Sequence, residues 1–179
     1  MQAVQKRSKN HAIQYTTADS SLGRMLVAAT DRGVCAVAFA KNDKELIGEL
    51  HDRFPGTEIL PAQNGHKSWL AEAVRYVADQ TNGKHALAAA FPLDVSATPF
   101  QAKVWKALQA IPWGETRTYS ELAKALGNPN ATRAVARAIA TNPVAVVVPC
   151  HRVIGKDGSL TGYRWGVERK RQLLAAEQM

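Results

Sequence analysis

The cysteine at position 150 has the greatest potential for chemistry in this chain. It is preceded by Pro149 and followed by His151 and Arg152. Neighbouring positive charge favours the thiolate, which is the form of cysteine that attacks electrophiles. A lone cysteine is more often a small, inert core residue. Here the flanking residues favour a nucleophilic thiol with a histidine beside it.

The residues before Cys150 predict how the thiol is positioned. Five small, β-prone residues at 144–148 lie between Pro143 and Pro149. Such a run is typical of a short buried strand, and proline ends a strand because it has no amide hydrogen for the ladder. We therefore expect a strand that delivers Cys150 to a site.

Two helices separated by a short turn are predicted before this strand. Thr118 and Glu121 fit a capping box, and Gly127 is suited to the end of the first helix. The second helix is expected from Ala131 to about Thr141. This is the outline of a helix-turn-helix. On pattern alone, an alanine-rich second helix is more often a packing helix than a DNA-binding one.

The first half of the chain reads as a small α/β domain. Strand-like segments within 12–40 flank a turn at 31–33, helices are expected at 42–54 and around 69–77, and a strand candidate lies at 87–91. We expect an antiparallel sheet. The predicted domains are residues 1–93, with a mobile tail at 1–10, and residues 94–179.

The second domain is expected to be mainly helical. Thr98 can cap its first helix, with Pro99 in the first turn, where the missing amide hydrogen costs nothing. Phe100, Val104 and Leu108 recur at helical spacing and predict a buried stripe.

Charge and cysteine content limit the possible partners. The net charge is +8, and residues 94–179 hold 12 lysines and arginines against 6 aspartates and glutamates. A basic surface suits a polyanion such as DNA, although it can also serve solubility alone. The 2 cysteines are too few for a disulfide framework or a four-cysteine zinc site, so we expect a cytoplasmic protein without metal or other cofactor. No membrane partner is expected. We expect the protein to be a monomer.

Several motifs share one register with Cys150. They are Asn-Pro at 142–143, Pro-Cys-His-Arg-Val at 149–153, Gly-Tyr-Arg-Trp-Gly at 162–166, Thr-Pro-Phe-Gln-Ala-Lys-Val-Trp at 98–105, Ile-Pro-Trp-Gly-Glu-Thr-Arg-Thr-Tyr at 111–119 and Arg-Ala-Val-Ala at 133–136. Together they closely resemble the O6-alkylguanine-DNA alkyltransferases. A weaker match, Ser-Leu-Gly-Arg at 21–24, resembles the N-terminal domain of that family. The whole chain is most similar to the C-terminal portion of the family's bacterial adaptive-response regulator.

This resemblance implies a fold and a reaction. It implies a ribonuclease H-like N-terminal domain and a winged-helix-like C-terminal domain. The implied reaction moves a methyl group from O6-methylguanine in double-stranded DNA, and also from O4-methylthymine, to Cys150. The damaged nucleotide must first be rotated out of the duplex. The product is a thioether with no good leaving group, so each molecule acts once.

The resemblance also implies the catalytic residues. Side chains of adjacent residues diverge, so His151 is expected to reach Cys150 through a water molecule. The matching family residues give Glu177 the role of holding His151 and give Asn142 the role of bracing the backbone around the thiol. Tyr119 is expected beside the displaced nucleotide, where it helps guanine leave as a neutral base. Without the family register, Glu177 would read as a solvated residue near a helix end.

The implied DNA contacts lie on the second helix of the helix-turn-helix, which the family places in the minor groove. Arg133 fills the space that the flipped base leaves, and Arg137 shares its face. Small residues allow a close approach, although Thr132 is larger than the expected alanine. The implied DNA-binding residues are Tyr119, Ala131, Thr132, Arg133, Ala134 and Arg137.

The substrate pocket is implied at Tyr163, Arg164, Trp165 and Val153. Trp165 is bulky where some family members have glycine. We therefore expect a pocket that accepts methyl better than larger alkyl groups.

Three alternatives remain open. A lesion-sensing protein of the alkyltransferase-like type would lack the cysteine, so Cys150 argues against it. A cysteine hydrolase with a Cys150–His151 dyad would have poor geometry, because the two residues are adjacent. The chain can also be either a stand-alone protein or a fragment of a longer regulator whose zinc module precedes it.

Overall fold

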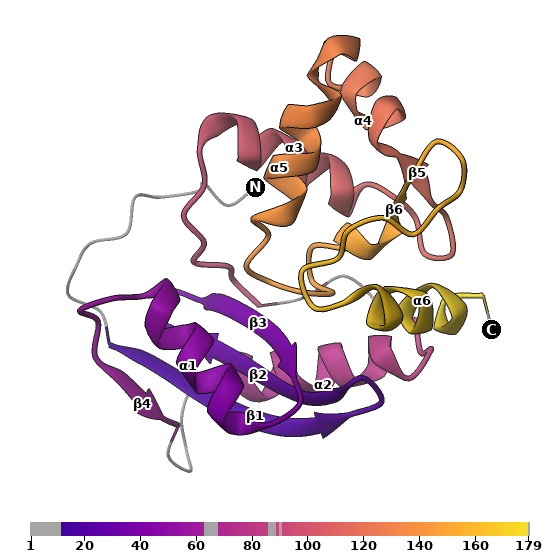
Figure 1. Cartoon of the computed structure of the whole chain (residues 1–179). Helices are drawn as coiled ribbons and strands as arrows, with labels where there is room; N and C mark the ends of the chain where they lie inside the picture. Colours follow the sequence, from indigo (N-terminus) through magenta and orange to yellow (C-terminus); the bar gives the residue numbers. More distant parts are fainter. Residues whose placement is uncertain (1–11, 63–67, 86–88, 90, 179) are drawn as a thin grey trace.

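A computed structural model describes residues 12–62, 68–85, 89 and 91–178 (Figure 1). The predicted tail at 1–10 lies outside these residues, and so do three of the five positions of the strand predicted at 87–91. No helix in the described part of the chain is long and apolar enough to cross a membrane. The predicted domain boundary between residues 93 and 94 stays a prediction.

The first part of the chain forms a four-stranded sheet. Its strands are β1 (Ile13–Ser20), β2 (Gly23–Ala29), β3 (Val34–Ala40) and β4 (Ile59–Pro61), in the order β3-β2-β1-β4. β1, β2 and β3 are antiparallel neighbours, whereas β4 pairs parallel to β1. The sheet is therefore mixed rather than purely antiparallel, because the helical connection after β3 returns the chain to the far edge in the direction of β1.

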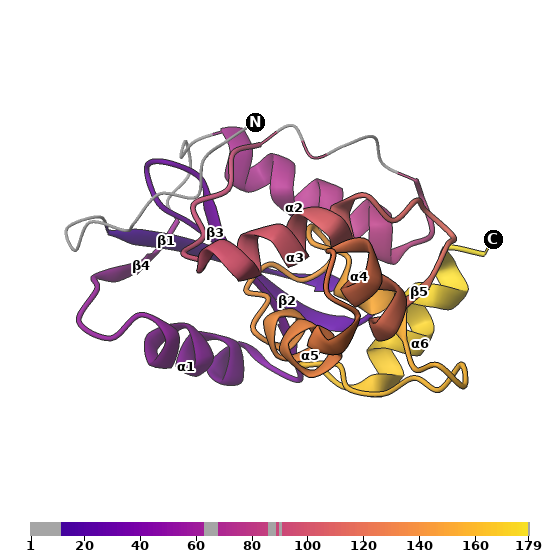
Figure 2. The ribbon, with the colours of Figure 1, turned by 90° about the horizontal axis from the view of Figure 1, so that it is seen from above.

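Two helices cover the sheet. Helix α1 (Asp43–Arg53) contacts β2 and β3, and helix α2 (Ser68–Thr81) contacts β1, β2 and β3. Figure 2 shows the sheet between them. The predicted apolar positions Leu46 and Leu50 of α1 are buried, as expected for an amphipathic helix.

The second part of the chain is mainly helical and lies above the sheet in Figure 1. It contains α3 (Pro99–Gln109), α4 (Tyr119–Ala125), the short helix η1 (Pro129–Ala131) and α5 (Thr132–Ala140). The predicted cap of Thr98 is present as a capping box with Gln101, and the predicted capping box of Thr118 with Glu121 is also present. The helix-turn-helix outline is thus built from α4, η1 and α5.

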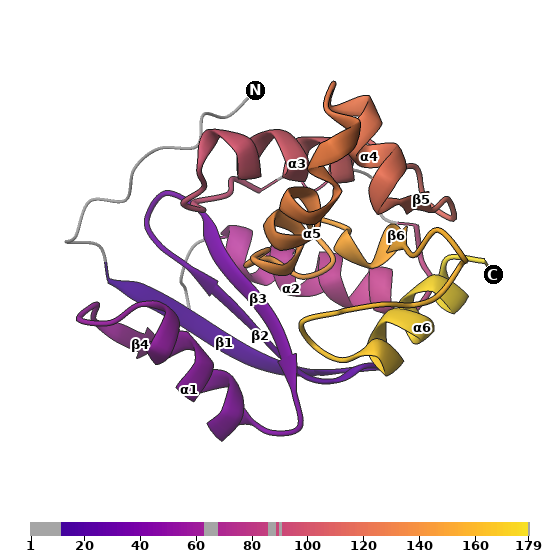
Figure 3. The same ribbon diagram turned by 45° about the horizontal axis from the view of Figure 1, so that its top comes forward.

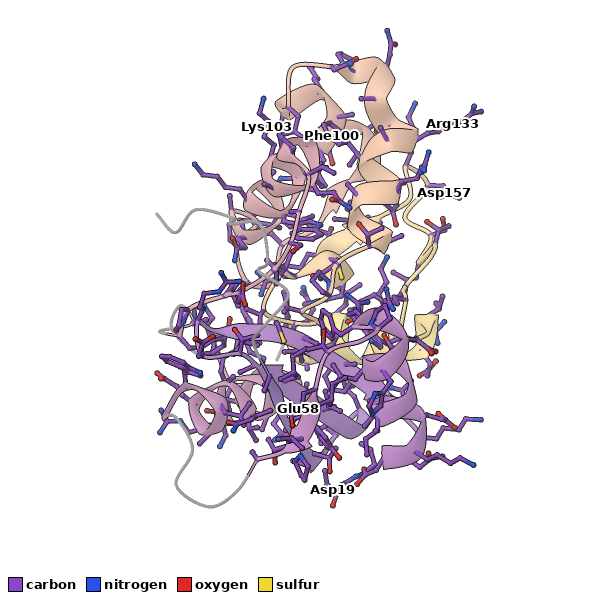
Figure 4. All side chains as sticks on the ribbon, turned by 90° about the vertical axis from the view of Figure 1, so that its left-hand side faces the viewer. Asp19, Glu58, Phe100, Lys103, Arg133 and Asp157 are labelled. Carbon is purple, nitrogen blue, oxygen red and sulfur yellow. The ribbon has the colours of Figure 1, made fainter. Side chains whose placement is uncertain are left out.

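The buried stripe predicted on α3 is wrong at its first position. Val104 and Leu108 are fully buried, but Phe100 is 38% exposed. Phe100 lies in the first turn of α3 and is labelled in Figure 4.

The strand predicted at 144–148 is also wrong. Only Val144 forms a β-bridge, to Val37 of β3, and the following residues turn back on themselves. Val146 has a φ of 69°, and the amide of Val148 donates to the carbonyl of Val144 at 3.1 Å. The apolar side chains are buried as predicted, but the backbone pairs locally and so forms a turn docked on the edge of β3.

The last segments close the molecule. The short helix η2 (Cys150–Arg152) leads into β6 (Val153–Ile154), which pairs with β5 (Arg117–Thr118) beside the start of α4. Figure 3 shows the chain after β6 running past α5 toward α6 (Val167–Ala176). Helix α6 contacts both α2 and η2, so it joins the two parts of the fold.

Candidate active site

Cys150 is the first residue of η2 and is only 5% exposed. The side-chain amide of Asn142 donates to its Sγ at 3.2 Å and to the carbonyl of Val148 at 2.9 Å. The Oδ1 atom of Asn142 accepts from the amide of Val144 at 3.0 Å. Asn142 therefore holds the turn and the sulfur at once. Burial raises the pKa of Cys150 to about 11, and the hydrogen bond from Asn142 works against that rise.

The Nε2 side of the His151 ring faces the C-terminal end of helix α6. Its Nε2 atom lies 2.6 Å from Oε1 of Glu177, the residue that caps α6, and both side chains are buried. Burial lowers the pKa of His151, and the contact with Glu177 opposes that shift. The histidine is therefore neutral near pH 7, with its ring orientation fixed by the carboxylate.

Arg152 and the backbone hold the Glu177 carboxylate. The Nε atom of Arg152 donates to both Glu177 oxygens at 3.1 and 3.0 Å, and Nη2 donates to Oε1 at 3.0 Å. The amide of Gly114 donates to Oε2 at 3.1 Å. Burial raises the pKa of Glu177, but the hydrogen bonds from His151 and Arg152 outweigh burial and keep it below its usual value. Glu177 is therefore ionised.

An ionised carboxylate can only accept hydrogen bonds, which determines the tautomer of His151. Its Nε2 atom must carry the proton that bonds to Glu177, so Nδ1 is left as an acceptor. The Nδ1 atom is buried and has no hydrogen-bond partner among the described residues. The Nδ1 atom of His151, the residue next to Cys150 in the chain, can therefore accept a proton in the interior of the protein.

A cavity of about 610 Å³ opens beside Cys150. This volume is typical of small-molecule sites, which are about 300–1,000 Å³. The wall comes from α4, α5 and the segment before α6, and its residues are Tyr119, Thr132, Arg133, Ala136, Ile139, Ala140, Thr161, Gly162, Tyr163 and Arg164. The sulfur therefore faces a space large enough for a heterocyclic base.

Two residues expected in the pocket wall do not line this cavity. Trp165 is 5% exposed and packs edge-on against Tyr163, with the ring centroids 5.3 Å apart. Val153 is fully buried in β6. Trp165 therefore supports the wall residue Tyr163, and neither Trp165 nor Val153 contributes to the cavity surface. The bulk of Trp165 therefore gives no direct reason for a preference for methyl groups.

The outer face of α5 is basic and nearly free of bulk. Arg133, Ala134 and Arg137 are exposed, whereas Val135 and Ile139 are buried as predicted. Figure 4 shows Arg133 projecting from this helix. Within the described part of the chain, no carboxylate pairs with Arg133 or Arg137. Both charges are thus available to a polyanion.

The chain matches two sequence profiles. Residues 13–95 match "6-O-methylguanine DNA methyltransferase, ribonuclease-like domain" and residues 99–179 match "6-O-methylguanine DNA methyltransferase, DNA binding domain". The methylated-DNA--protein-cysteine methyltransferase of Methanosarcina barkeri is 39% identical over 92% of this chain and 96% of its own length. The chain belongs to the 6-O-methylguanine DNA methyltransferase family. The predicted family is thereby confirmed.

Other members of this family show how much of the chain is shared. The bifunctional transcriptional activator/DNA repair enzyme Ada of Escherichia coli is 46% identical over 94% of this chain and 46% of its own length. The chain therefore spans about half the length of the Ada proteins that it matches. The crystal structure of Mycobacterium tuberculosis OGT in complex with DNA superposes with a TM-score of 0.76, at 36% identity over 92% of each chain.

The fold brings the predicted catalytic residues of this family member together beside one cavity. Cys150, His151, Glu177 and Asn142 form a connected buried group, and Tyr119 lines the cavity beside it. Sequence reasoning treated Arg152 only as a nearby positive charge and missed its bonds to Glu177. The position of Arg152 within the Pro-Cys-His-Arg-Val motif was the available signal.

Proposed function

We propose that this chain repairs double-stranded DNA by transferring the methyl group of O6-methylguanine to Cys150. One observation carries the proposal: the buried sulfur lies at the cavity, and the adjacent histidine has a free Nδ1 atom and an ionised carboxylate behind it. This is the arrangement of nucleophile, base and orienting group. The names of the relatives support the same reaction.

The reaction is a displacement at carbon. The Cys150 proton passes to Nδ1 of His151, through a water molecule, and the thiolate attacks the methyl carbon. The S–C bond forms while the C–O6 bond breaks, and the bonding electrons stay on the guanine. A proton from the Tyr119 hydroxyl, replaced in turn by the His151 proton, makes the leaving base neutral. The products are guanine and S-methylcysteine, so the protein reacts once.

The DNA must present the base outside the stack. The lesion atom is stacked inside the duplex, and the cavity is too buried for an intact duplex to reach the sulfur. We assign α5 to the minor groove, with Arg133 in the gap left by the base and with Tyr119 beside the extruded nucleotide. Ala131, Thr132 and Ala134 permit close approach, and Arg137 contacts phosphate. The protein acts as a cytoplasmic monomer in this proposal, with O4-methylthymine as its second substrate.

Intact-protein mass spectrometry tests the proposal directly. The protein is mixed with a duplex that contains one O6-methylguanine and is then digested for peptide mapping. We expect a gain of one methylene per molecule, confined to Cys150 and absent in Cys150→Ser. Cys35→Ser is the matched control, because Cys35 is also a buried cysteine but does not line the cavity that holds Cys150.

Two other results would replace the proposal. Binding to the duplex without any change of mass would point to lesion sensing without repair. Repeated turnover of an ester or a peptide, with no loss of activity, would point to a cysteine hydrolase.

A further inference from the structure

Lys170 is the largest fully buried side chain in the described part of the protein. It is the fourth residue of α6, and its exposed fraction is 0%. Lysine is almost never fully buried unless its ammonium group is paired, because removing the charge from water is costly. The position of this ammonium group therefore requires an explanation.

The Nζ atom of Lys170 joins two backbone carbonyls. It donates to the carbonyl of Val153 at 2.5 Å and to the carbonyl of Thr161 at 3.1 Å. Val153 directly follows the helical turn that holds Cys150, and Thr161 lines the cavity. The carbonyl of Thr161 also accepts from the Tyr119 hydroxyl at 3.1 Å. Lys170 thus links the cysteine turn to the segment of the cavity wall that the Tyr119 hydroxyl also contacts.

The charge of Lys170 is not balanced by a carboxylate. Glu177, the buried acid nearest to the cysteine turn, is bonded by His151, Arg152 and Gly114. Among the described residues, no aspartate or glutamate forms an ion pair with Nζ. Burial lowers the pKa of Lys170, and the ionisable group that opposes this shift is Cys150.

The remaining groups that face the sulfur do not supply a competing charge. Tyr119 of α4 and Tyr163 of the cavity wall are neutral phenols whose pKa values burial raises. Asn142 is a neutral donor. On η2, His151 is neutral, and the charge of Arg152 is matched by Glu177. Two arginines also line the cavity: Arg164 is bonded to Glu49, and Arg133 has no carboxylate partner but is exposed to solvent. Among the described residues of the site, the buried charge without an acidic partner is therefore the ammonium group of Lys170.

We propose that Lys170 is a positioning and electrostatic residue of methyl transfer: its buried ammonium group fixes the cavity wall to the cysteine turn and offsets the negative charge of the Cys150 thiolate. This inference rests on the proposed function. It explains how a sulfur whose burial opposes ionisation can still react as a thiolate near neutral pH. Holding the carbonyls of Val153 and Thr161 together would require only hydrogen-bond donors at position 170. Offsetting the charge of the thiolate requires a positive charge there.

The rate of Cys150 alkylation by iodoacetamide as a function of pH separates these roles. Lys170→Gln keeps side-chain donors but removes the charge, and Lys170→Arg keeps the charge. Arg171→Gln is the matched control, because it removes one charge from the exposed neighbour on the same helix. We expect the pH midpoint of Cys150 alkylation to rise by about one unit in Lys170→Gln. At pH 7.5 its rate should fall about tenfold, and Lys170→Arg should recover most of the loss.

An unchanged midpoint in folded Lys170→Gln would overturn the electrostatic role. If that variant does not fold, the unaltered protein labelled with 13C at lysine Cε replaces it. The Lys170 resonance should then shift as Cys150 titrates, and Cys150→Ser should abolish that shift; a resonance that ignores Cys150 would overturn the inference. Iodoacetamide needs no DNA, so a midpoint shift without methyl uptake from the duplex would refute the proposed function alone.

Discussion

The Nε2 atom of His151 and the Oε1 atom of Glu177 lie 2.6 Å apart in the interior of the protein. The two residues are 26 positions apart in the chain, and Glu177 caps the final helix. The C-cap of helix α6 therefore completes the site around Cys150. Because the same carboxylate also accepts from Arg152, it orients the base and balances a buried charge at once.

Replacing Glu177 by glutamine should impair both reaction and stability. The variant leaves the buried Arg152 charge without its partner, which costs about 3 kcal/mol of unfolding free energy. It also removes the anion that fixes the His151 tautomer, so the methyl transfer rate should fall about 100-fold. Single-turnover kinetics with a lesion duplex and urea unfolding measure the two effects.

Glu168→Gln is the control for this variant, because Glu168 is an exposed residue in the first turn of the same helix. It should change the unfolding free energy by less than about 0.5 kcal/mol. Equal rates in Glu177→Gln and Glu168→Gln would refute the orienting role of Glu177.

Acid should destabilise the folded protein in two stages. The pKa of His151 in the folded state lies below 6.5, so the unfolded chain binds its proton first as the pH falls. The pKa of Glu177 is also lowered in the folded state, so its contribution is present above pH 4.5 and is lost as the pH falls further through the folded value. Because both pKa values are lowered by folding, protonation of either residue lowers the unfolding free energy in acid.

Urea unfolding at pH 7.5, 6.0 and 5.0 measures the first stage. The unfolding free energy should decrease steadily across this series, and His151→Asn should show a shallower decrease, because it removes the group that titrates. Constant stability between pH 7.5 and 5.0 would contradict the assignment of a neutral, buried His151.

Asn142→Ala should loosen the turn that carries the cysteine. The substitution removes three buried hydrogen bonds, to Val148, Cys150 and Val144, and leaves polar backbone groups unsatisfied. We expect a loss of about 3 kcal/mol of unfolding free energy. Because the Asn142 bond also opposes the rise in the pKa of Cys150, iodoacetamide should alkylate the variant more slowly at pH 7.5.

Asn82→Ala is the matched control, since Asn82 is exposed in the turn after α2. Its unfolding free energy should stay within about 0.5 kcal/mol of the parent value. A similar small change in Asn142→Ala would show that the turn does not depend on this side chain.

Local chemistry was readable from the sequence, and long-range docking was not. The capping boxes at Thr98 and Thr118 need only side chains three residues apart, so their patterns predicted the helix starts correctly. The run 144–148 has the composition of a strand, but it docks on β3 through one bridge and then turns at Val146. Composition predicted its burial and could not predict its backbone path.

The site shows the same division. Family register, rather than periodicity, indicated Glu177, because a glutamate at the end of a helix is usually solvated. The burial of Lys170 had no signal in the sequence: a lysine in an amphipathic helix is ordinarily exposed, and its burial here depends on the packing of α6 against segments distant in the sequence. Arg152 and Lys170 were therefore missed, because their roles depend on contacts between distant segments that the family resemblance did not supply.

Arg133→Ala should separate base extrusion from methyl transfer itself. Arg133 is exposed on α5 at the cavity wall, where it can fill the gap in the stack. Without it, extrusion should become less favourable by about 1–2 kcal/mol, which lowers the rate with a lesion duplex by about tenfold or more. Free O6-methylguanine needs no extrusion, so the ratio of duplex rate to free-base rate should fall.

Arg137→Ala is the matched comparison on the same helix. Because Arg137 is assigned to a phosphate, its removal should weaken binding to all duplexes and reduce the salt dependence of binding by about one ion, without a selective effect on the lesion. The two arginines lie one helical turn apart on the same exposed face, so net charge and position on α5 are closely matched between the variants. Unchanged rates of Arg133→Ala at saturating DNA would instead place Arg133 among the residues that bind phosphate, because a residue that only raises affinity for DNA cannot change the ratio of duplex rate to free-base rate at saturation.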